Sequence, residues 1–112
     1  MNYLKTLLLA LLFAFSAHEA HAQQPKTKVT LGIKPDYWYT MDGTGVRIDG
    51  VLKDQIAQKV GMKEGDIIVA FNDKSIKDIF EYKKLLEKSN PGDKVKVKVL
   101  RNQKAMYFDV TF

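Results

Sequence analysis

The sequence predicts an α+β fold: a small antiparallel β-sandwich or partial barrel of five to six strands, capped by two helices. Short segments with alternating apolar residues are separated by turns rich in glycine, asparagine and aspartate, and two segments with helical features interrupt them. Hydrophobic residues make up 46% of the 112-residue chain, which is enough for one small core. The expected order of elements is β-β-α-β-β-α-β-β.

The N-terminal residues 1–22 have the layout of a secretory signal peptide. An apolar run from Leu7 to Phe15 follows one positive charge, and Ala20-His21-Ala22 has the small-x-small pattern of a cleavage site. The run is too short to span a bilayer, so we expect no membrane span once the signal is removed. Residues 23–28 form a polar linker, and residues 29–112 form one domain of an exported protein, either periplasmic or secreted.

The domain is expected to open with a β-hairpin. Val29, Leu31 and Ile33 alternate with polar or small residues, as in a half-buried strand. A turn cluster at Met41–Gly45 leads to a second alternating strand at Val46–Val51.

A short helix and a buried strand follow. Asp54 is the expected N-cap of a helix at Gln55–Val60, which Gly61 ends. The continuous apolar run Ile67–Phe71 predicts a strand buried on both faces, and Ile76 belongs to the strand that closes its hairpin.

The second helix is longer and better marked. Asp78 is its expected N-cap, and Glu81 completes a capping-box pattern for a helix at Ile79–Ser89. Strands at Val95–Leu100 and Ala105–Phe112 complete the domain.

The composition excludes several classes of chemistry. Both histidines, His18 and His21, lie in the predicted signal, and the chain has no cysteine. No Ser-His-Asp or Cys-His nucleophile can be built in the domain, and no imidazole or thiolate metal site. We therefore expect no enzyme, no metal and no cofactor.

The net charge of +5 is spread over the chain. Lys94, Lys96 and Lys98 alternate with valines, which is the pattern of the solvated face of a strand. We therefore expect no nucleic-acid binding.

Three motifs together point to a known family. Leu31-Gly32-Ile33 opens the domain, Gly61-Met62-Lys63-Glu64-Gly65-Asp66-Ile67-Ile68 follows the first helix, and Pro91-Gly92-Asp93 follows the second. Over Val29 to Phe112 the chain resembles the PDZ domain, in the form found in exported bacterial HtrA proteases and some zinc aminopeptidases. The resemblance implies a permuted strand order, in which the final strand, Met106 to Phe112, takes the place of a strand that would otherwise precede the first motif.

The resemblance implies a peptide-binding site at this opening motif. The amides of Leu31, Gly32 and Ile33 would hold the C-terminal carboxylate of a partner, and the partner peptide would add as a strand to the sheet edge. Free N–H groups form an anion-binding concavity, and an open sheet edge pairs with an extended peptide. A second interpretation takes Gly32 simply as the glycine of a β-bulge.

The resemblance also assigns Ile79, Lys83 and Leu86 to the facing wall of the groove, and Tyr82 and Leu85 to the core. It implies apolar ligand side chains at the last position and at the third position from the end. Lys83 would meet an acidic ligand side chain.

One feature departs from this pattern. Pro35 has no N–H at the position that normally donates to the peptide, which costs about 0.5–1.5 kcal/mol of binding free energy. Tyr37, Trp38 and Tyr39 follow it, and we interpret them either as an aromatic contact surface or as a segment of which Tyr37 or Tyr39 packs on the core.

The sequence therefore predicts an exported, non-catalytic module that recognises the C-terminus of another exported protein or peptide. A peptidase and a peptidase substrate are both candidates for this partner. One alternative is a detached specificity module of a separate exported peptidase. The other is a scaffolding or self-association domain that uses Tyr37-Trp38-Tyr39.

Overall fold

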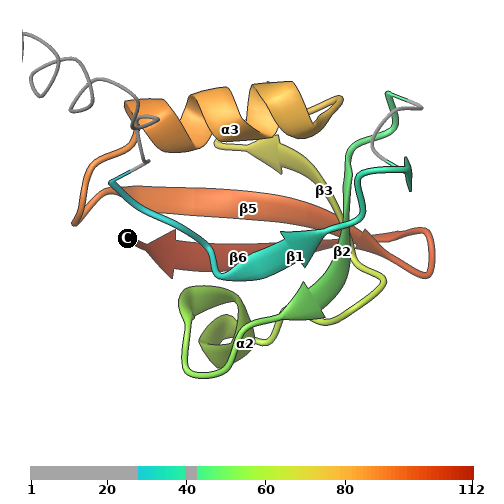
Figure 1. Ribbon diagram of the computed structural model, residues 1–112, viewed down its shortest axis with the longest axis horizontal. Helices are drawn as coiled ribbons and strands as arrows, with labels where there is room; N and C mark the ends of the chain where they lie inside the picture. Colours follow the sequence, from blue (N-terminus) through green and yellow to red (C-terminus); the bar gives the residue numbers. More distant parts are fainter. Residues whose placement is uncertain (1–27, 40–42) are drawn as a thin grey trace, which may run out of the picture.

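A computed structural model describes residues 28–39 and 43–112, and Figure 1 shows its arrangement. The described strands form one open antiparallel sheet in the order β1-β2-β3-β5-β6, with β4 beside β3. The elements are β1 (Ile33–Pro35), β2 (Val46–Val51), α2 (Ile56–Val60), β3 (Ile67–Phe71), β4 (Lys74–Ser75), α3 (Ile79–Lys88), β5 (Lys94–Arg101) and β6 (Lys104–Thr111). The predicted fold class and element order are confirmed. The predicted signal peptide, linker residues 23–27 and residues 41–42 of the first turn lie outside the described residues.

Strand β2 joins two parts of the sheet. Its C-terminal half pairs with β1, where Ile33 lies opposite Val51, and its first residue, Val46, lies opposite Ile68 of β3. The pairing of β1 with β2 confirms the predicted hairpin. Strand β1 comes first in the strand order and has β2 as its only neighbour among the described strands, so it is an edge strand of the described sheet.

Strands β5 and β6 form the longest hairpin. Their register runs without a break from Lys94 opposite Thr111 to Arg101 opposite Lys104. Asn102 and Gln103 both have positive φ, at 51° and 66°, as the two central residues of a tight type I′ turn require. Strand β6 occupies the last place in the strand order, next to β5 and at the far end from β1.

Helix α3 begins as predicted. The Asp78 side chain accepts a hydrogen bond from the Glu81 N–H at 2.9 Å. The Glu81 carboxylate accepts a hydrogen bond from the N–H of Lys77 at 2.9 Å. The return bond of the capping box therefore involves the residue before the N-cap and not Asp78 itself. The helix ends at Lys88, one residue earlier than predicted.

Helix α2 begins differently from the prediction, and the expected Asp54 cap is wrong. Asp54 has φ of 62°, in the left-handed region, whereas an N-cap needs an extended backbone. Gln55 is the N-cap, with φ of −104° and ψ of 175°. Gly61 ends the helix with φ of 100°, as expected.

Three strand predictions also need correction. The opening strand begins at Ile33 and not at Val29, because Gly32 has φ of 76° and interrupts the extended backbone. Strand β3 is not buried on both faces, since only Ile68 and Phe71 of its five residues are buried. Ile76 is buried but lies just beyond the short strand β4.

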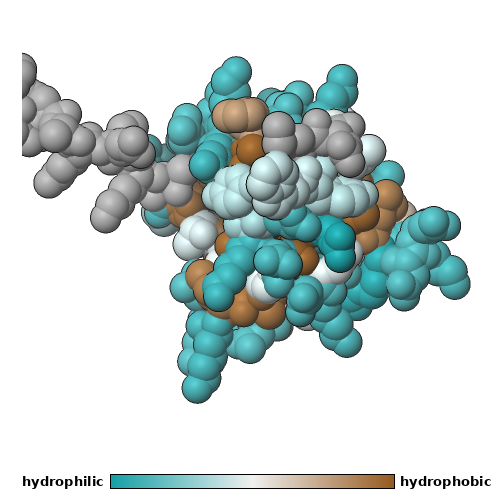
Figure 2. All heavy atoms as spheres, turned by 45° about the vertical axis from the view of Figure 1, so that its right-hand side comes forward, coloured by the Kyte–Doolittle hydropathy of each residue, from teal (hydrophilic) through white to brown (hydrophobic). Residues whose placement is uncertain are grey.

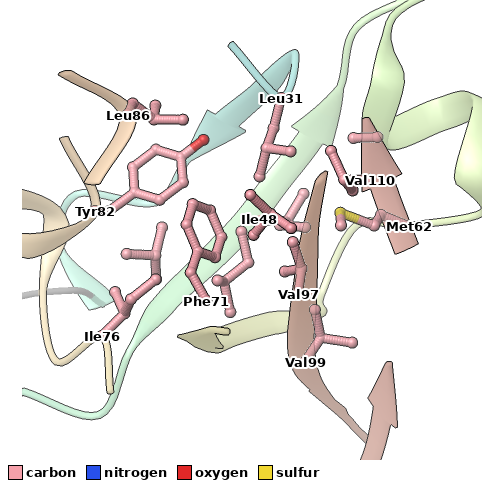
Figure 3. Packing of buried hydrophobic residues seen from close by; sticks show 14 of the residues in the cluster. Leu31, Ile48, Met62, Phe71, Ile76, Tyr82, Leu86, Val97, Val99 and Val110 are labelled. Atoms are coloured by element: carbon pink, nitrogen blue, oxygen red, sulfur yellow. The ribbon is translucent and has the colours of Figure 1, made fainter. Parts of the chain in front are cut away.

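The core lies between the strands and the two helices. Figure 3 shows its side chains, which come from the opening loop, β2, β3, β5, β6, α3 and the segments after α2 and β4. On the face shown in Figure 2, hydrophilic residues surround separate hydrophobic patches. The rings of Phe71 and Tyr82 meet edge to face, with centroids 5.9 Å apart. This contact joins α3 to the middle of the sheet.

One buried ion pair fixes the end of the β5–β6 hairpin. Asp66 is 2% exposed, and its two carboxylate oxygens accept from Nε and Nη2 of Arg101 at 2.8 and 2.7 Å. Arg101 Nη2 also donates to the Gly61 carbonyl at 3.0 Å, and the Lys63 N–H donates to Asp66 at 2.9 Å. The pair therefore ties β5 to the loop between α2 and β3.

Candidate functional site

The predicted site residues come from two elements that run in opposite directions. In Figure 1, β1 and the loop before it run below α3, and the start of β1 lies toward the C-terminal end of that helix. In Figure 3, Leu31 of the loop and Tyr82 and Leu86 of α3 point toward the same part of the core. The edge of β1 and the side of α3 are the two sides that the sequence prediction assigns to the candidate site.

The opening loop is held rigidly against α2. A Cβ added at Gly32 would lie 2.4 Å from the Cβ of Gln55, which is closer than real atoms approach. The carbonyl of Leu31 accepts from the Ala57 N–H, and the carbonyl of Gly32 accepts from the Leu52 N–H, both at 2.8 Å. Glycine is required here both by the left-handed φ and by this close approach.

One of the predicted carboxylate-binding amides has a partner within the loop. The N–H of Gly32 donates to the Thr30 hydroxyl at 3.1 Å. A ligand carboxylate that uses this amide would replace the hydroxyl as the acceptor. Thr30 therefore lies next to the predicted carboxylate-binding amides, although the sequence interpretation did not include it.

The pairing of β1 shows which backbone groups face outward. The N–H of Asp36 donates inward to the Arg47 carbonyl at 2.9 Å. Because N–H groups alternate between the two sides of an antiparallel strand, residues 33 and 35 present theirs to the open edge. Ile33 offers a donor there, and Pro35 offers none.

On α3, two of the three predicted groove residues are largely covered. Ile79 is 7% exposed and Leu86 is 5% exposed, and both belong to the buried cluster together with Tyr82. Lys83 is exposed, whereas Leu85 packs at the periphery of the core. A ligand that contacts Ile79 or Leu86 in this conformation touches only a small part of either side chain.

The chain turns sharply after β1. The Asp36 carboxylate accepts from the N–H groups of Trp38 and Tyr39, each at 3.1 Å, which forms a local turn. Trp38 is 86% exposed, whereas Tyr39 is partly buried under the Arg47 guanidinium, 5.6 Å from its ring centroid. Among the described residues, the buried core cluster includes none of the side chains of Tyr37, Trp38 and Tyr39.

Tyr37 connects this turn to α3. Its ring centroid lies 5.6 Å from Nζ of Lys83. Burial raises the pKa of the Tyr82 hydroxyl, and the charge of an ionised Tyr37 nearby raises it further. Lys83, which contacts the Tyr37 ring, is one of the predicted groove residues, whereas Tyr82 is buried in the core.

Sequence reasoning missed three features of this site. The Thr30 contact had a usable signal, because threonine hydroxyls often accept from the N–H two residues later. The approach of Gln55 to Gly32 and the contact between Tyr37 and Lys83 join distant parts of the chain and leave no local pattern.

The described residues hold neither a metal-binding cluster nor a membrane-spanning helix. In residues 28–39 and 43–112, no group of three or more His, Cys, Asp or Glu side chains is placed to hold a metal ion. Within the same residues, no helix has the length and apolar character needed to cross a membrane.

Comparison with known proteins identifies the family. The family model for the PDZ domain matches residues 11–112, so the chain belongs to the PDZ domain family. The periplasmic pH-dependent serine endoprotease DegQ of Escherichia coli is 36% identical over 67 residues, which are 60% of this chain and 15% of DegQ. The chain thus spans a small part of the length of this relative.

Two solved structures have a similar fold. An aminopeptidase N family protein from Idiomarina loihiensis superimposes with a TM-score of 0.70 at 26% identity, over 80% of this chain and 14% of that one. The HtrA3 PDZ domain bound to a phage-derived ligand superimposes with a TM-score of 0.60 at 20% identity, over 73% of this chain and 82% of that one. The PDZ domain is a peptide-binding module typical of HtrA proteases, and the relatives are periplasmic proteases.

Proposed function

We propose that this protein is an exported, non-catalytic binding module that recognises the C-terminus of another exported polypeptide. The observation that carries the proposal is the edge of β1. This strand follows the left-handed Gly32, presents the N–H of Ile33 outward and runs below α3 in the view of Figure 1. Such an edge accepts an extended peptide as an added strand.

In the proposed complex the peptide runs antiparallel to β1. Its terminal carboxylate lies at the amides of Leu31, Gly32 and Ile33. There the carboxylate replaces the Thr30 hydroxyl as the acceptor of the Gly32 N–H. The solved HtrA3 domain, which shares this fold, is bound to a ligand ending in valine. That ligand supports an apolar final residue for the present chain as well.

The helix side sets the proposed side-chain preference. The small exposed parts of Ile79 and Leu86 favour apolar ligand residues at the third position from the end and at the last position. Lys83 is exposed and positively charged, so it favours an acidic ligand side chain next to them.

The relatives suggest where the module acts. They are periplasmic proteases, which supports export of this chain and a partner that is a peptidase or a peptidase substrate. The relatives favour one form of this proposal, in which the module supplies specificity to a separate peptidase. Co-purification from the exported fraction tests this form, and we expect a peptidase as the main partner.

Screening a C-terminal peptide library against the 112-residue chain tests the proposed function. We expect saturable binding of peptides with apolar ends and a loss of at least about tenfold when their C-termini are amidated, because the charged carboxylate provides the strongest hydrogen bonds. Equal binding of free and amidated peptides would contradict the carboxylate role of the loop.

A second candidate function is self-association through Tyr37, Trp38 and Tyr39. The observation that favours it is the 86% exposure of Trp38, since tryptophan is enriched at the centres of interfaces. Sedimentation velocity over a range of concentrations tests it. A dimer that Trp38→Ala abolishes supports this function, whereas a monomer at high concentration contradicts it.

A further inference from the structure

Strand β6 forms the second edge of the sheet. It comes last in the strand order, and β5 is its only neighbour among the described strands. The register of the two strands is unbroken, and just beyond it the Phe112 N–H donates to the Asp93 carbonyl at 3.0 Å. Because N–H groups alternate between the two sides of an antiparallel strand, every second residue of β6 points its N–H and its carbonyl away from β5. These outward residues are Ala105, Tyr107, Asp109 and Thr111.

The same alternation separates the two faces of β6. The side chains of Met106, Phe108 and Val110 pack on the core, whereas the outward residues are exposed to solvent. Helix α2 approaches β6 on the core side, since a Cβ added at Gly61 would lie 3.8 Å from the Phe108 ring. Within residues 28–39 and 43–112, no strand pairs with the outward backbone groups of β6.

The two edges of the sheet differ in their protection against further pairing. Strand β1 has three residues, ends in Pro35 and shifts its register at Lys34/Pro35. Proline, irregular register and short length all discourage the addition of another strand. Strand β6 has eight residues, no proline and no register shift. A long and regular edge of this kind is a template for another strand.

A second copy of the chain fits this edge in one antiparallel register. With Phe108 opposite the partner's Phe108, Tyr107 lies opposite the partner's Asp109, and Ala105 lies opposite the partner's Thr111. Every outward N–H and carbonyl of β6 then has a partner. A shift of two residues in one direction leaves Thr111 without a partner in β6, and the opposite shift places two Asp109 carboxylates face to face, which is unfavourable.

The charges of the solvated face complement themselves in this register. Within one hairpin, Asp109 lies 4.0 Å from Lys96, and Tyr107 lies opposite Lys98. Across the interface, one row therefore contains Lys96, Asp109, the partner's Tyr107 and the partner's Lys98. Neighbouring strands are about 4.8 Å apart, so about 10 Å separates the backbone of Asp109 from that of the partner's Lys98, which the two side chains can span. A two-fold axis repeats the row, as an interface between identical copies requires.

We propose that two copies of this chain pair through β6, antiparallel and related by a two-fold axis, so that their sheets become one continuous sheet. A β1 edge lies at either end of that sheet, so both proposed peptide sites stay free. The inference goes beyond the proposed function and does not depend on peptide binding. It also uses a different surface from the turn that carries Trp38. Because strand pairing alone covers less than the roughly 1,200 Å² of a stable interface, we expect a Kd in the micromolar range or weaker.

Two measurements on the 112-residue chain test the dimer and its location. Sedimentation velocity from micromolar to millimolar concentration should show a reversible equilibrium between monomer and dimer. Amide hydrogen exchange over the same range should become slower for Tyr107 and Asp109, by about tenfold or more where the dimer predominates, because these amides are hydrogen-bonded only in the dimer.

Substitutions at Tyr107 separate pairing from folding. Tyr107→Pro removes an outward N–H but no bond to β5, so the fold should persist, which circular dichroism checks. It deletes one interface bond from each copy and should raise the Kd of the dimer by about tenfold or more. The matched control Tyr107→Phe keeps the N–H and the ring, so it should dimerise as the natural chain does.

A second variant leaves the backbone unchanged. Asp109→Lys places like charges in each row of the interface and should raise the Kd of the dimer by about fivefold or more. Trp38→Ala is its control, since it changes an exposed aromatic side chain outside β6 and should leave the Kd unchanged.

The inference fails if the natural chain is a monomer at every concentration, which leaves the β6 edge to a strand of another protein. It also fails if a dimer forms while the Tyr107 and Asp109 amides stay unprotected. A dimer that tolerates both Tyr107→Pro and Asp109→Lys but not Trp38→Ala assigns the interface to the aromatic turn and overturns pairing through β6. None of these outcomes changes the proposal of peptide binding at β1, which the amidated peptides test separately.

Discussion

The two ends of the sheet differ in how they are held. At one end, β5 and β6 pair over eight consecutive residue pairs, and the buried pair of Arg101 and Asp66 anchors their turn end. At the other end, β1 contains three residues, its register with β2 shifts at Lys34/Pro35, and the ion pair of Arg47 and Asp36 spans 3.9 Å near the surface.

This difference separates stability from recognition. The long regular β5–β6 hairpin buries valines and pairs eight consecutive residues, so it contributes mainly to stability, although β6 is itself the last strand of the described open sheet. A short edge strand next to a glycine keeps outward groups available, and its neighbours restrict what can use them. We therefore expect substitutions at the β5–β6 end to act mainly on unfolding and those at the β1 end to act on binding as well.

The largest effect is expected for Arg101→Leu. It leaves the carboxylate of Asp66, which is 2% exposed, without two charged hydrogen bonds, and should lower the free energy of unfolding by about 3 kcal/mol. Urea unfolding measures the loss. The matched control is Arg47→Leu, whose more exposed ion pair should be worth less than about 1 kcal/mol. Equal losses would contradict the contrast between the two ends.

Gly32→Ala is expected to come next, with a loss of about 2 kcal/mol. Alanine strains at φ of 76°, and its Cβ would overlap the Cβ of Gln55. Gly92→Ala is the control, because Gly92 has φ of 92° but open space around its Cβ. A difference of about 1 kcal/mol between the two in urea unfolding isolates the contact with Gln55. If the two variants lose the same stability, the close approach has no energetic consequence.

A smaller effect is expected for Asp78→Ala. It removes the side-chain cap of α3 and should cost about 1 kcal/mol, with faster hydrogen exchange in the first turn of the helix. Asp78→Asn keeps an acceptor and should remain near the natural stability. Similar losses in both variants would point to the charge of Asp78 and not to the cap.

The smallest effect at neutral pH comes from Tyr82. Burial, with a further contribution from Tyr37, raises its pKa above the usual value of about 10, so the folded state keeps the phenol protonated where the unfolded chain ionises. The stability that the protonated Tyr82 contributes is fully present below pH 10. As the pH rises above 10, the free energy of unfolding falls by about 1.4 kcal/mol per pH unit. In urea unfolding from pH 8 to 11, Tyr82→Phe should lack this extra fall. The exposed Tyr107→Phe should retain it, and identical pH profiles for both would contradict the assignment.

Local patterns predicted several elements well. The alternation in Val46–Val51 and the apolar run Ile67–Phe71 coincide with β2 and β3, and the Asp78 cap marks the start of α3. These succeeded because strand alternation and capping depend on residues that are neighbours in the chain. Asp54 failed because its side chain favours a cap, whereas the backbone there turns through a left-handed conformation.

The candidate site was less predictable. Leu31-Gly32-Ile33 drew attention through its glycine, and the structure supplies the tertiary cause, which is the approach of Gln55. The assignment of Ile79, Lys83 and Leu86 to a groove remains a prediction. Helical spacing places them on related faces, but it does not determine how far each is covered.

The amino-acid pattern was sufficient for the fold class, the order of strands and helices, and the lysine-rich solvated face of β5. Folding in three dimensions decided that Arg101 pairs with Asp66 and that Tyr37 reaches Lys83. The physical reason is distance along the chain. Periodicity and capping are set by residues a few positions apart, whereas these contacts join residues more than thirty positions apart and exist only after the sheet and α3 have packed.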